Sequence, residues 1–547
     1  MKFRKLSLFL ILIGFLFASA AQAHDSSEKL GQVNFPISCG AETRQTFNRA
    51  VALLHSFWYE EAEKAFSEVT EIDPTCAMGD WGIAMSYYHP VWQPPTPAEL
   101  RKGLAAVERA KSIGAKTERE KDYIAAIEVF YRDSDKLDHR ERSLAFEKRM
   151  EQVYRRYPED REAAIFYALS LLGTAPPTDK SYTNQKKAAE ILNEVSLKEP
   201  EHPGVVHYII HSFDYPELAY LALPAARSYA KIAPSSPHAL HMPSHIFTRL
   251  GLWQESIQSN LASAAAAKNW VAKAHPGAAS FDELHAMDYL AYAYLQGAQD
   301  NKAKDVVDEI SGITQVDEEN FAAAYAFAAV PARYAMERSR WDEAAALKVH
   351  PNAFPWDRFP YAEAIIYFSR AMGGARTGNL SAARKDIEKL ASLERVLVEA
   401  RNDYWARQVE IQRQVASAWL ALAEGRREKA IGLMRVTADL EDSADKHPVT
   451  PGAIAPAREL LGEMLLELNQ PAQAMKEFEA SQRVDLNRFR SLYGAARAAE
   501  LAGDLKKART YNSKLISLCQ YADTERPELK HAKAFLKIGL AQTARDK

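Results

Sequence analysis

The feature that most constrains the fold is a spacing pattern of small and large residues that recurs about every 34 residues. Its clearest early copy covers residues 43–76. Ala50 and Ala62 stand where two helices of a hairpin would touch, and Phe66 stands where a large ring would fill the gap to the next hairpin. Pro74 ends the second helix, because proline cannot continue it. The pattern predicts pairs of antiparallel helices.

Further copies of the pattern follow along the chain. Near the C-terminus, Gly462, Ala474 and Phe478 take the corresponding offsets. Weaker copies are marked by pairs of small residues, namely Ala291 and Ala303, Gly378 and Ala383, and Gly425 and Ala430. The chain therefore resembles the tetratricopeptide repeat (TPR) family over most of its length. The resemblance implies an all-α fold, a solenoid in which helical hairpins stack into a superhelix.

Proline-rich stretches interrupt the repeats at residues 90–97, 352–360 and 448–456. Proline breaks a helix interior, so these stretches are expected to be loops between hairpins. We therefore expect an irregular solenoid in two regions. Residues 24–311 would form an N-terminal TPR-like region that contains a histidine-rich segment, and residues 312–547 a C-terminal TPR-like region closed by capping helices.

The start of the chain has the three parts of a secretory signal peptide. Lysine and arginine residues open it, residues 6–20 are almost uniformly apolar, and residues 21–23 form the small-residue motif Ala-Gln-Ala. The order of these three parts predicts a signal peptide over residues 1–23, as in an exported bacterial TPR-containing protein. We expect the mature protein to be periplasmic or secreted, with no integral membrane segment. The formal net charge of −3 gives no reason to expect a nucleic-acid partner.

The cysteines are few enough to be considered one by one. Cys39 precedes the first expected helix and Cys76 follows the second, so the ends of one hairpin would bring them together. In an oxidising compartment this arrangement favours a Cys39–Cys76 disulfide. Two separate buried thiols are the alternative, because sequence alone does not fix pairing. Cys519 is left over and is expected to be a buried thiol.

Histidines are concentrated in one segment, since eight of the fifteen lie within residues 202–285. His207 and His211 are four residues apart, as are His241 and His245, and such pairs share one face of a helix. Neutral imidazole is the commonest metal ligand, so these four residues could hold a divalent transition metal. Pro243 lies between His241 and His245. If a helix begins at this proline, His241 would lie before the helix, and the argument that the two residues share a helix face would weaken.

The TPR resemblance also suggests which side chains face the concave groove of the superhelix. Positions two, five and nine of the first helix of each repeat usually do so in that family. Aligning three successive repeats on this register places His207, Asp214, His238, His241, His245, His285, Asp288 and Tyr292 in the groove. Together with His211, which lies four residues after His207, they are the candidate ligand-binding residues. The alternative is a network of buried histidines that stabilises irregular hairpins, since satisfied core histidines are common.

These observations favour a binding protein over an enzyme. There is no HExxH, Walker loop, GxSxG or CxxC motif, so no catalytic residue is assigned. The leading hypothesis is an exported TPR scaffold that holds a peptide, a protein partner or a small ligand in a groove lined by histidine and aromatic residues. One alternative is a metal-binding protein or metal-dependent hydrolase that uses the histidine segment. Another is a structural subunit of an envelope assembly.

Overall fold

The computed structural model describes residues 28–545 except residue 177, and the expected signal peptide over residues 1–23 lies outside that part. In the described part, helices and loops make up the whole fold, and the only β-type pairing is an isolated bridge between Ala279 and Val316. None of the helices described combines the length and apolar character needed to cross a membrane. The predicted all-α class is confirmed.

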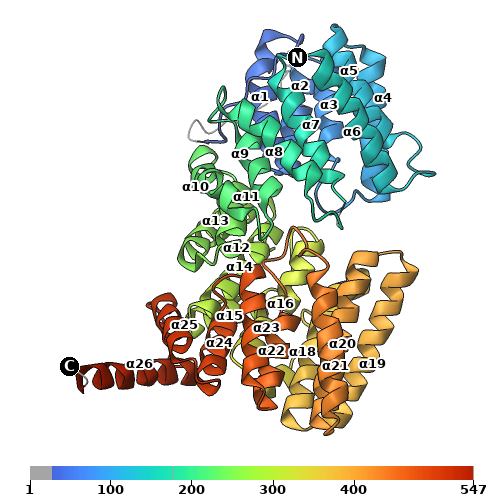
Figure 1. The fold of residues 1–547 in the computed structure, drawn as a ribbon. Helices are drawn as coiled ribbons and strands as arrows, with labels where there is room; N and C mark the ends of the chain where they lie inside the picture. Colours follow the sequence, from blue (N-terminus) through green and yellow to red (C-terminus); the bar gives the residue numbers. More distant parts are fainter. Residues whose placement is uncertain (1–27, 177, 546–547) are drawn as a thin grey trace, which may run out of the picture.

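The first nine helices form an N-terminal lobe, in the upper half of Figure 1, in which each helix packs against the next along the chain. These helices are α1 (Arg44–His55), α2 (Tyr59–Ile72), α3 (Ala77–Ser86), α4 (Pro97–Ile113), α5 (Glu118–Tyr131), α6 (His139–Arg156), α7 (Arg161–Gly173), α8 (Thr183–Ser196) and α9 (Pro203–Phe213). The stacking is that of the predicted helical hairpins.

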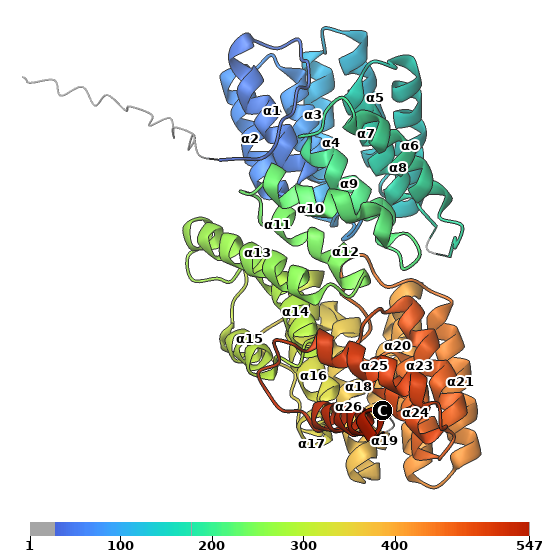
Figure 2. The ribbon, with the colours of Figure 1, turned by 60° about the vertical axis from the view of Figure 1, so that its left-hand side comes forward.

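Four helices connect this lobe to the rest of the molecule: α10 (Leu223–Ile232), α11 (Pro237–His241), α12 (Pro243–Arg249) and α13 (Trp253–Ala274). They lie between the two lobes in both Figure 1 and Figure 2. Helix α9 packs against α10 and α12, while α13 packs against the first helix of the second lobe. The connection is therefore a packed layer of helices.

The C-terminal lobe contains the remaining helices, and α26 extends away from its body in Figure 1. They are α14 (Phe281–Gln296), α15 (Asp300–Gly312), α16 (Phe321–Glu337), α17 (Trp341–Ala345), α18 (Pro360–Thr377), α19 (Leu380–Glu399), α20 (Asp403–Ala423), α21 (Arg427–Asp442), α22 (Ala457–Glu467), α23 (Pro471–Val484), α24 (Phe489–Leu501), α25 (Leu505–Leu518) and α26 (Pro527–Arg545). Short 3-10 turns are η1 (Ala41–Thr43), η2 (Ala219–Ala222) and η3 (Trp356–Arg358).

The recurring small and large residues explain how neighbouring hairpins fit together. Phe66 of α2 is fully buried, and its ring fills the space beside Gly82 of α3, where any added side chain would collide with it. Phe478 of α23 lies in the same way against Gly462 and Gly494, on the helices before and after it. Each glycine thus permits an approach that a larger residue would block.

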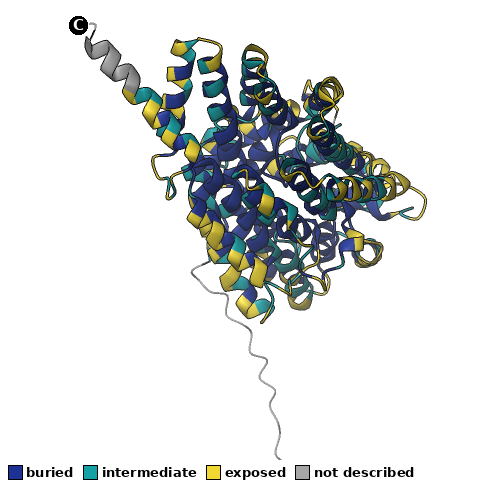
Figure 3. Cartoon of the chain, turned by 90° about the horizontal axis from the view of Figure 1, so that it is seen from below, coloured by how far each residue is buried: buried dark blue, intermediate teal, exposed yellow. Residues whose placement is uncertain are grey.

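The hydrophobic core is divided between the lobes. One buried cluster runs from Leu30 to Phe247 and a second from Trp253 to Ala498, so the division falls in the loop between α12 and α13. This is earlier in the chain than the boundary near residue 311 that the repeats suggest. Figure 3 shows buried residues along the packed faces of the helices, with exposed ones concentrated on the outer faces. The histidine-rich helices lie where the two clusters meet.

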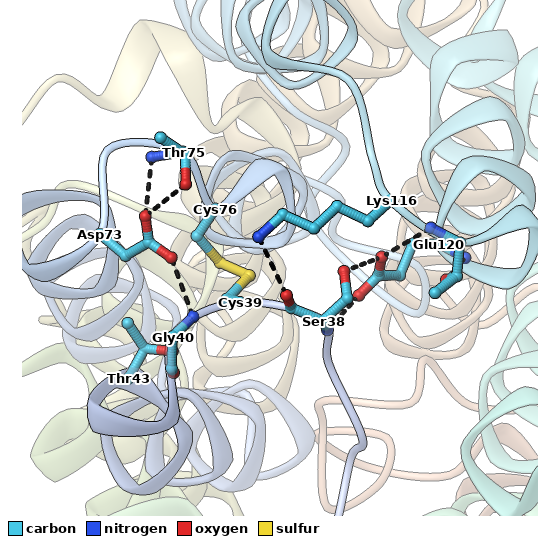
Figure 4. Close-up of a disulfide and its surroundings, with 10 residues drawn as sticks. Ser38, Cys39, Gly40, Thr43, Asp73, Thr75, Cys76, Lys116 and Glu120 are labelled. Carbon is cyan, nitrogen blue, oxygen red and sulfur yellow. Dashed lines mark hydrogen bonds between the residues drawn. A yellow bond between two sulfur atoms is a disulfide. The ribbon is translucent and has the colours of Figure 1, made fainter.

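A disulfide between Cys39 and Cys76 ties the segment before α1 to the start of α3 (Figure 4). The surrounding polar contacts hold the same junction, because Asp73 accepts hydrogen bonds from the backbone nitrogens of Gly40 and Thr75. Cys519 is a buried free thiol. The two half-cystines thus meet at the ends of one hairpin, as their positions in the sequence suggest.

Candidate metal centre

Six histidines from four helices converge at the junction of the lobes. Helix α9 carries His207 and His211, α11 carries His238 and His241, α12 carries His245, and α14 carries His285. None is more than 8% exposed. Their ring nitrogens form two groups of three, in each of which all ligand atoms lie within 4.8 Å of one another: His207, His211 and His238, and then His241, His245 and His285.

The local sequence explains how the second group assembles despite a proline. Pro243 ends α11 and occupies the first turn of α12, where its missing N–H costs no hydrogen bond. His241 therefore ends one short helix, and His245 stands in the next. The two rings nevertheless lie 5.0 Å apart between centroids. The helix break expected at Pro243 is present, and the pair still forms.

In the first group, the hydrogen bonding of His207 fixes where its proton lies. The Nδ1 atom of His207 is 2.6 Å from the backbone oxygen of His55, which can only accept a hydrogen bond. Nδ1 is therefore the protonated nitrogen of the neutral ring, and Nε2 carries a lone pair. That Nε2 lies 3.1 Å from Nε2 of His211 and 3.2 Å from Nε2 of His238.

In the second group, two rings point lone pairs at each other. Nδ1 of His241 donates to Oδ1 of Asn260 over 2.6 Å, because the amide nitrogen of Asn260 is itself engaged with a backbone oxygen. Nδ1 of His245 donates to Oδ2 of Asp214 over 3.0 Å. The Nε2 atoms of His241 and His245 are then both unprotonated in the neutral rings, yet they lie only 3.0 Å apart. The hydroxyl of Tyr289 lies 3.3 Å from Nε2 of His245.

The electrostatic surroundings keep these imidazoles neutral. Burial lowers the pKa of His207, His238, His241 and His285 well below the ordinary value, and neighbouring histidines lower it further. Burial also lowers the pKa of His211 to about 3. A neutral imidazole offers the lone pair that a metal ion requires. The cluster is therefore a set of neutral imidazoles rather than a set of cations.

Asp214 orients the site from outside it. Its carboxylate also contacts the guanidinium of Arg249 at 2.9 Å and the ammonium of Lys446 at 2.8 Å. Burial alone would raise the pKa of Asp214, but the charges of Lys446 and Arg249 hold it well below its usual range. Asp214 is thus an ionised hydrogen-bond acceptor for His245.

Two residues of the predicted set face a different part of the molecule. Asp288 is paired with Arg333, with Nε and Oδ1 2.8 Å apart. The hydroxyl of Tyr292 accepts a hydrogen bond from Arg488 over 2.8 Å. Both guanidinium groups are fully buried. Asp288 and Tyr292 therefore belong to ion and hydrogen-bond networks of the C-terminal lobe, although they share α14 with His285.

A narrow crevice leads to the histidines. Its volume is about 10 Å³, enough for one water molecule or one ion. Its walls are formed by His211, His238, Met242, His245, His285, Trp92, Phe281, Asp282, Ala322, Pro448 and Val449. Trp92 and Pro448 come from two of the proline-rich stretches, which thus cover the site. The crevice is too small to admit a peptide.

A third group of potential ligands was not apparent from the sequence. Glu162 on α7 lies 2.9 Å from Nε2 of His55 and 3.0 Å from Nε2 of His202. Burial alone would raise the pKa of Glu162, but the two histidines outweigh it and hold this pKa well below its ordinary value. Nothing in the spacing of these three residues marks them as neighbours. They lie directly behind the first group, because the backbone oxygen of His55 contacts His207.

Comparisons with known proteins give only distant structural matches. No protein-family model and no curated protein sequence matches the chain. Yeast Tom70 aligns with 92% of this chain and 96% of its own, with 11% identity and a TM-score of 0.34. Human IFIT1, in a dimer with m7Gppp-AAAA, aligns with 81% of this chain and 90% of its own, with 12% identity and a TM-score of 0.35. At these values the similarities assign no ligand or activity to this chain.

Proposed function

We propose that this protein binds a transition metal ion through the buried histidines of α9, α11, α12 and α14. The observation that supports the proposal best is the pair formed by His241 and His245. Their Nδ1 atoms donate to Asn260 and Asp214, so their Nε2 lone pairs face each other across 3.0 Å. Lone pairs repel at this distance, and a cation between them would turn the repulsion into two coordination bonds.

The spacing of the nitrogens supports the same proposal. Two ligands about 2.0–2.1 Å from a zinc ion, at an angle of roughly 90–110°, are about 2.9–3.4 Å apart. The Nε2 contacts of His207 with His211 and His238, at 3.1 and 3.2 Å, fall in this range. Imidazole suits zinc, copper, nickel and iron, and copper binds most tightly of the divalent ions of this series.

The hydrogen bonds made by the Nδ1 atoms of these rings support the proposal further. Histidine ligands of metals usually donate their other ring nitrogen to a carboxylate or a carbonyl oxygen, which fixes the tautomer and the orientation of the ring. His207 donates to the backbone oxygen of His55, His241 to the side-chain oxygen of Asn260, and His245 to the carboxylate of Asp214. In each of these rings the hydrogen bond from Nδ1 leaves the lone pair of Nε2 available to a metal ion.

Metal analysis of untagged protein tests the proposal. Protein stripped with a chelator and reloaded with Cu²⁺ or Zn²⁺ should retain the metal after gel filtration and should melt at a higher temperature. Free metal at a hundred times its Kd would stabilise the fold by about 2.7 kcal/mol. The double variant His241→Ala, His245→Ala should show a smaller shift, because only the first group of histidines remains, whereas His275→Ala, which alters a half-exposed histidine outside the cluster, should keep the full shift.

The outcome that overturns the proposal is a wild-type protein that retains no metal and melts at the same temperature with and without it. Circular dichroism of the double variant distinguishes a lost ligand from a lost fold. A variant that keeps its helical signal but binds less metal than the wild-type protein supports the proposal. Because the wild-type measurement needs no substitution, the test is decisive even if the double variant unfolds.

A wider cleft favours a binding-scaffold role as a second candidate function. It has a volume of about 690 Å³, and its walls include the aromatic rings of Tyr325, Tyr404 and Trp405 together with charges of both signs. Aromatic side chains are frequent anchors of protein interfaces. We propose that a peptide or protein partner binds there. Peptides selected on the wild-type protein should bind Trp405→Ala at least about tenfold more weakly, and equal binding would exclude this cleft.

Export is also part of the proposal, because the disulfide between Cys39 and Cys76 requires an oxidising compartment to persist. Cell fractionation of the full-length chain tests it. The mature protein should be found outside the cytoplasm, with an N-terminus near His24. Full-length protein retained in the cytoplasm with free thiols at both positions would contradict it.

A further inference from the structure

The two groups of three histidines have a relationship that a single metal site would not require. We infer that they hold two metal ions that share one bridging oxygen ligand, such as hydroxide, in the crevice between them. The inference rests on the proposed metal-binding function. It concerns how many ions are bound and how they are coupled.

The six ring nitrogens cannot all ligate one ion. Ligands on opposite sides of a single ion would lie about 4.2 Å apart, twice a metal–nitrogen distance of about 2.0–2.1 Å. All six would then fall within 4.8 Å of one another, yet only sets of three meet that limit. The sets have no member in common. Each therefore defines its own metal position.

The two positions are neighbours. Rings of different groups approach closely at two points, since the centroids of His211 and His245 are 6.2 Å apart, as are those of His238 and His241. The connection is also direct along the chain, because His238 and His241 stand on the same short helix, α11. Two ions bound by these rings would therefore lie on either side of the crevice.

Both groups open onto the same space. His211 and His238 of the first group and His245 and His285 of the second line the one crevice. Three imidazoles leave one coordination position of a tetrahedral ion open. The open positions of both ions would face the crevice, so that one ligand there could bind both ions. Its volume of about 10 Å³ is that of a single small ligand.

Charge favours an anion in that position. The six imidazoles are neutral, so a pair of divalent ions would bring four positive charges into a buried site that already contains Lys446 and Arg249 nearby. Asp214 is committed to those two cations and to His245. Asp282 is a further carboxyl group in the crevice wall. A hydroxide between the ions would lower their mutual repulsion, because it lies close to both.

The crevice adjoins a larger cavity. Trp92, Phe281 and Asp282 line both the crevice and a neighbouring pocket of about 240 Å³. That pocket is also lined by Glu60, Glu99 and other acidic side chains. The acidic side chains of this pocket would raise the local concentration of cations next to the crevice.

Copper provides the sharpest test. Chelator-stripped, untagged protein is loaded with Cu²⁺, desalted and measured for copper content and for the integrated electron paramagnetic resonance signal. We expect two ions per chain with most of the signal lost, because a bridging oxygen couples the two unpaired spins. His285→Ala should bind one ion and recover the full signal for it. His275→Ala is the matched control and should behave as wild type.

The possible outcomes distinguish a failure of the coupled metal pair from a failure of the proposed metal binding itself. Protein that binds no copper overturns the proposed function itself. One ion per chain, or two ions with the full signal of isolated Cu²⁺, overturns the coupled pair while leaving metal binding intact. If His285→Ala fails to fold, His238→Ala makes the same test from the first group, and the wild-type signal decides the question on its own.

Discussion

The Nδ1 atom of His207 in α9 lies 2.6 Å from the backbone oxygen of His55, the last residue of α1. The side chain of His55 is meanwhile bound to the hydroxyl of Tyr208 and to Glu162. The end of the first helix thus sets the tautomer of a histidine 152 residues later in the chain. The N-terminal hairpin is therefore part of the histidine site as well as part of the solenoid.

Removing the carboxylate of Glu162 should weaken this arrangement. Glu162→Ala leaves Nε2 of both His55 and His202 without their partner in a fully buried position. Each unsatisfied buried group costs about 1–3 kcal/mol, so we expect a loss of roughly 2–5 kcal/mol in the free energy of unfolding. Glu162→Gln keeps an oxygen and a nitrogen in place and should lose less. Urea denaturation of the three proteins checks this, and equal losses would contradict it.

Asn260 should matter for metal affinity although it is not a proposed ligand. Its side-chain oxygen accepts the Nδ1 proton of His241. Asn260→Leu removes that acceptor and should lower metal affinity by about 10–100-fold, the usual effect of losing the hydrogen-bond partner of a ligating histidine. Asn260→Asp retains an acceptor and should bind metal more tightly than the leucine variant. Competition with a chromogenic chelator measures both, and equal affinities would show that the orientation of His241 is set elsewhere.

Much of the fold follows from the sequence because it depends on local spacing. The distances between small and large residues specify helical hairpins, and the hairpin brings Cys39 close to Cys76. The i,i+4 spacing likewise places His207 beside His211. These features require only that neighbouring residues share a helix or a turn.

The rest of the site depends on how distant helices are rotated against one another, which spacing does not fix. Asp288 and Tyr292 share α14 with His285, yet they face Arg333 and Arg488. The acceptors for the ring protons of His207 and His241 lie on α1 and α13, 152 and 19 residues away, at spacings that mark no contact. The predicted open groove is closed at the histidines because Trp92 and Pro448, from the proline-rich stretches, cover them.

The disulfide should contribute substantially to stability. Cys39 and Cys76 are 37 residues apart, and closing a loop of this length should stabilise the fold by about 3–4 kcal/mol through the entropy of the unfolded chain. The variant Cys39→Ser, Cys76→Ser should therefore unfold at lower urea concentration. Dithiothreitol should lower the stability of the wild-type protein to the same extent and leave the double variant unchanged. A wild-type protein indifferent to reduction would exclude the bond in solution.

The pH dependence of stability should report on Glu441, at the edge of the wide cleft. Burial raises the pKa of Glu441 from 4.5 to about 8, with the nearby Asp485 and Asp442 acting in the same direction. Its side chain also accepts a hydrogen bond from the backbone nitrogen of Ala457. Between pH 4.5 and 8 the folded protein therefore keeps a proton that the unfolded chain has released. Raising the pH then favours unfolding, by up to about 1.4 kcal/mol per pH unit.

Glu441→Gln isolates this contribution, because the amide is neutral at every pH and its oxygen can still accept from Ala457. Below pH 4.5 the carboxyl is protonated in both states, so wild type and variant should be similarly stable there. As the pH rises toward 8, the wild-type protein should lose stability relative to the variant, and above it the difference should become constant. Urea denaturation across this range provides the measurement. Parallel curves for the two proteins would show that Glu441 ionises as readily in the fold as in the unfolded chain.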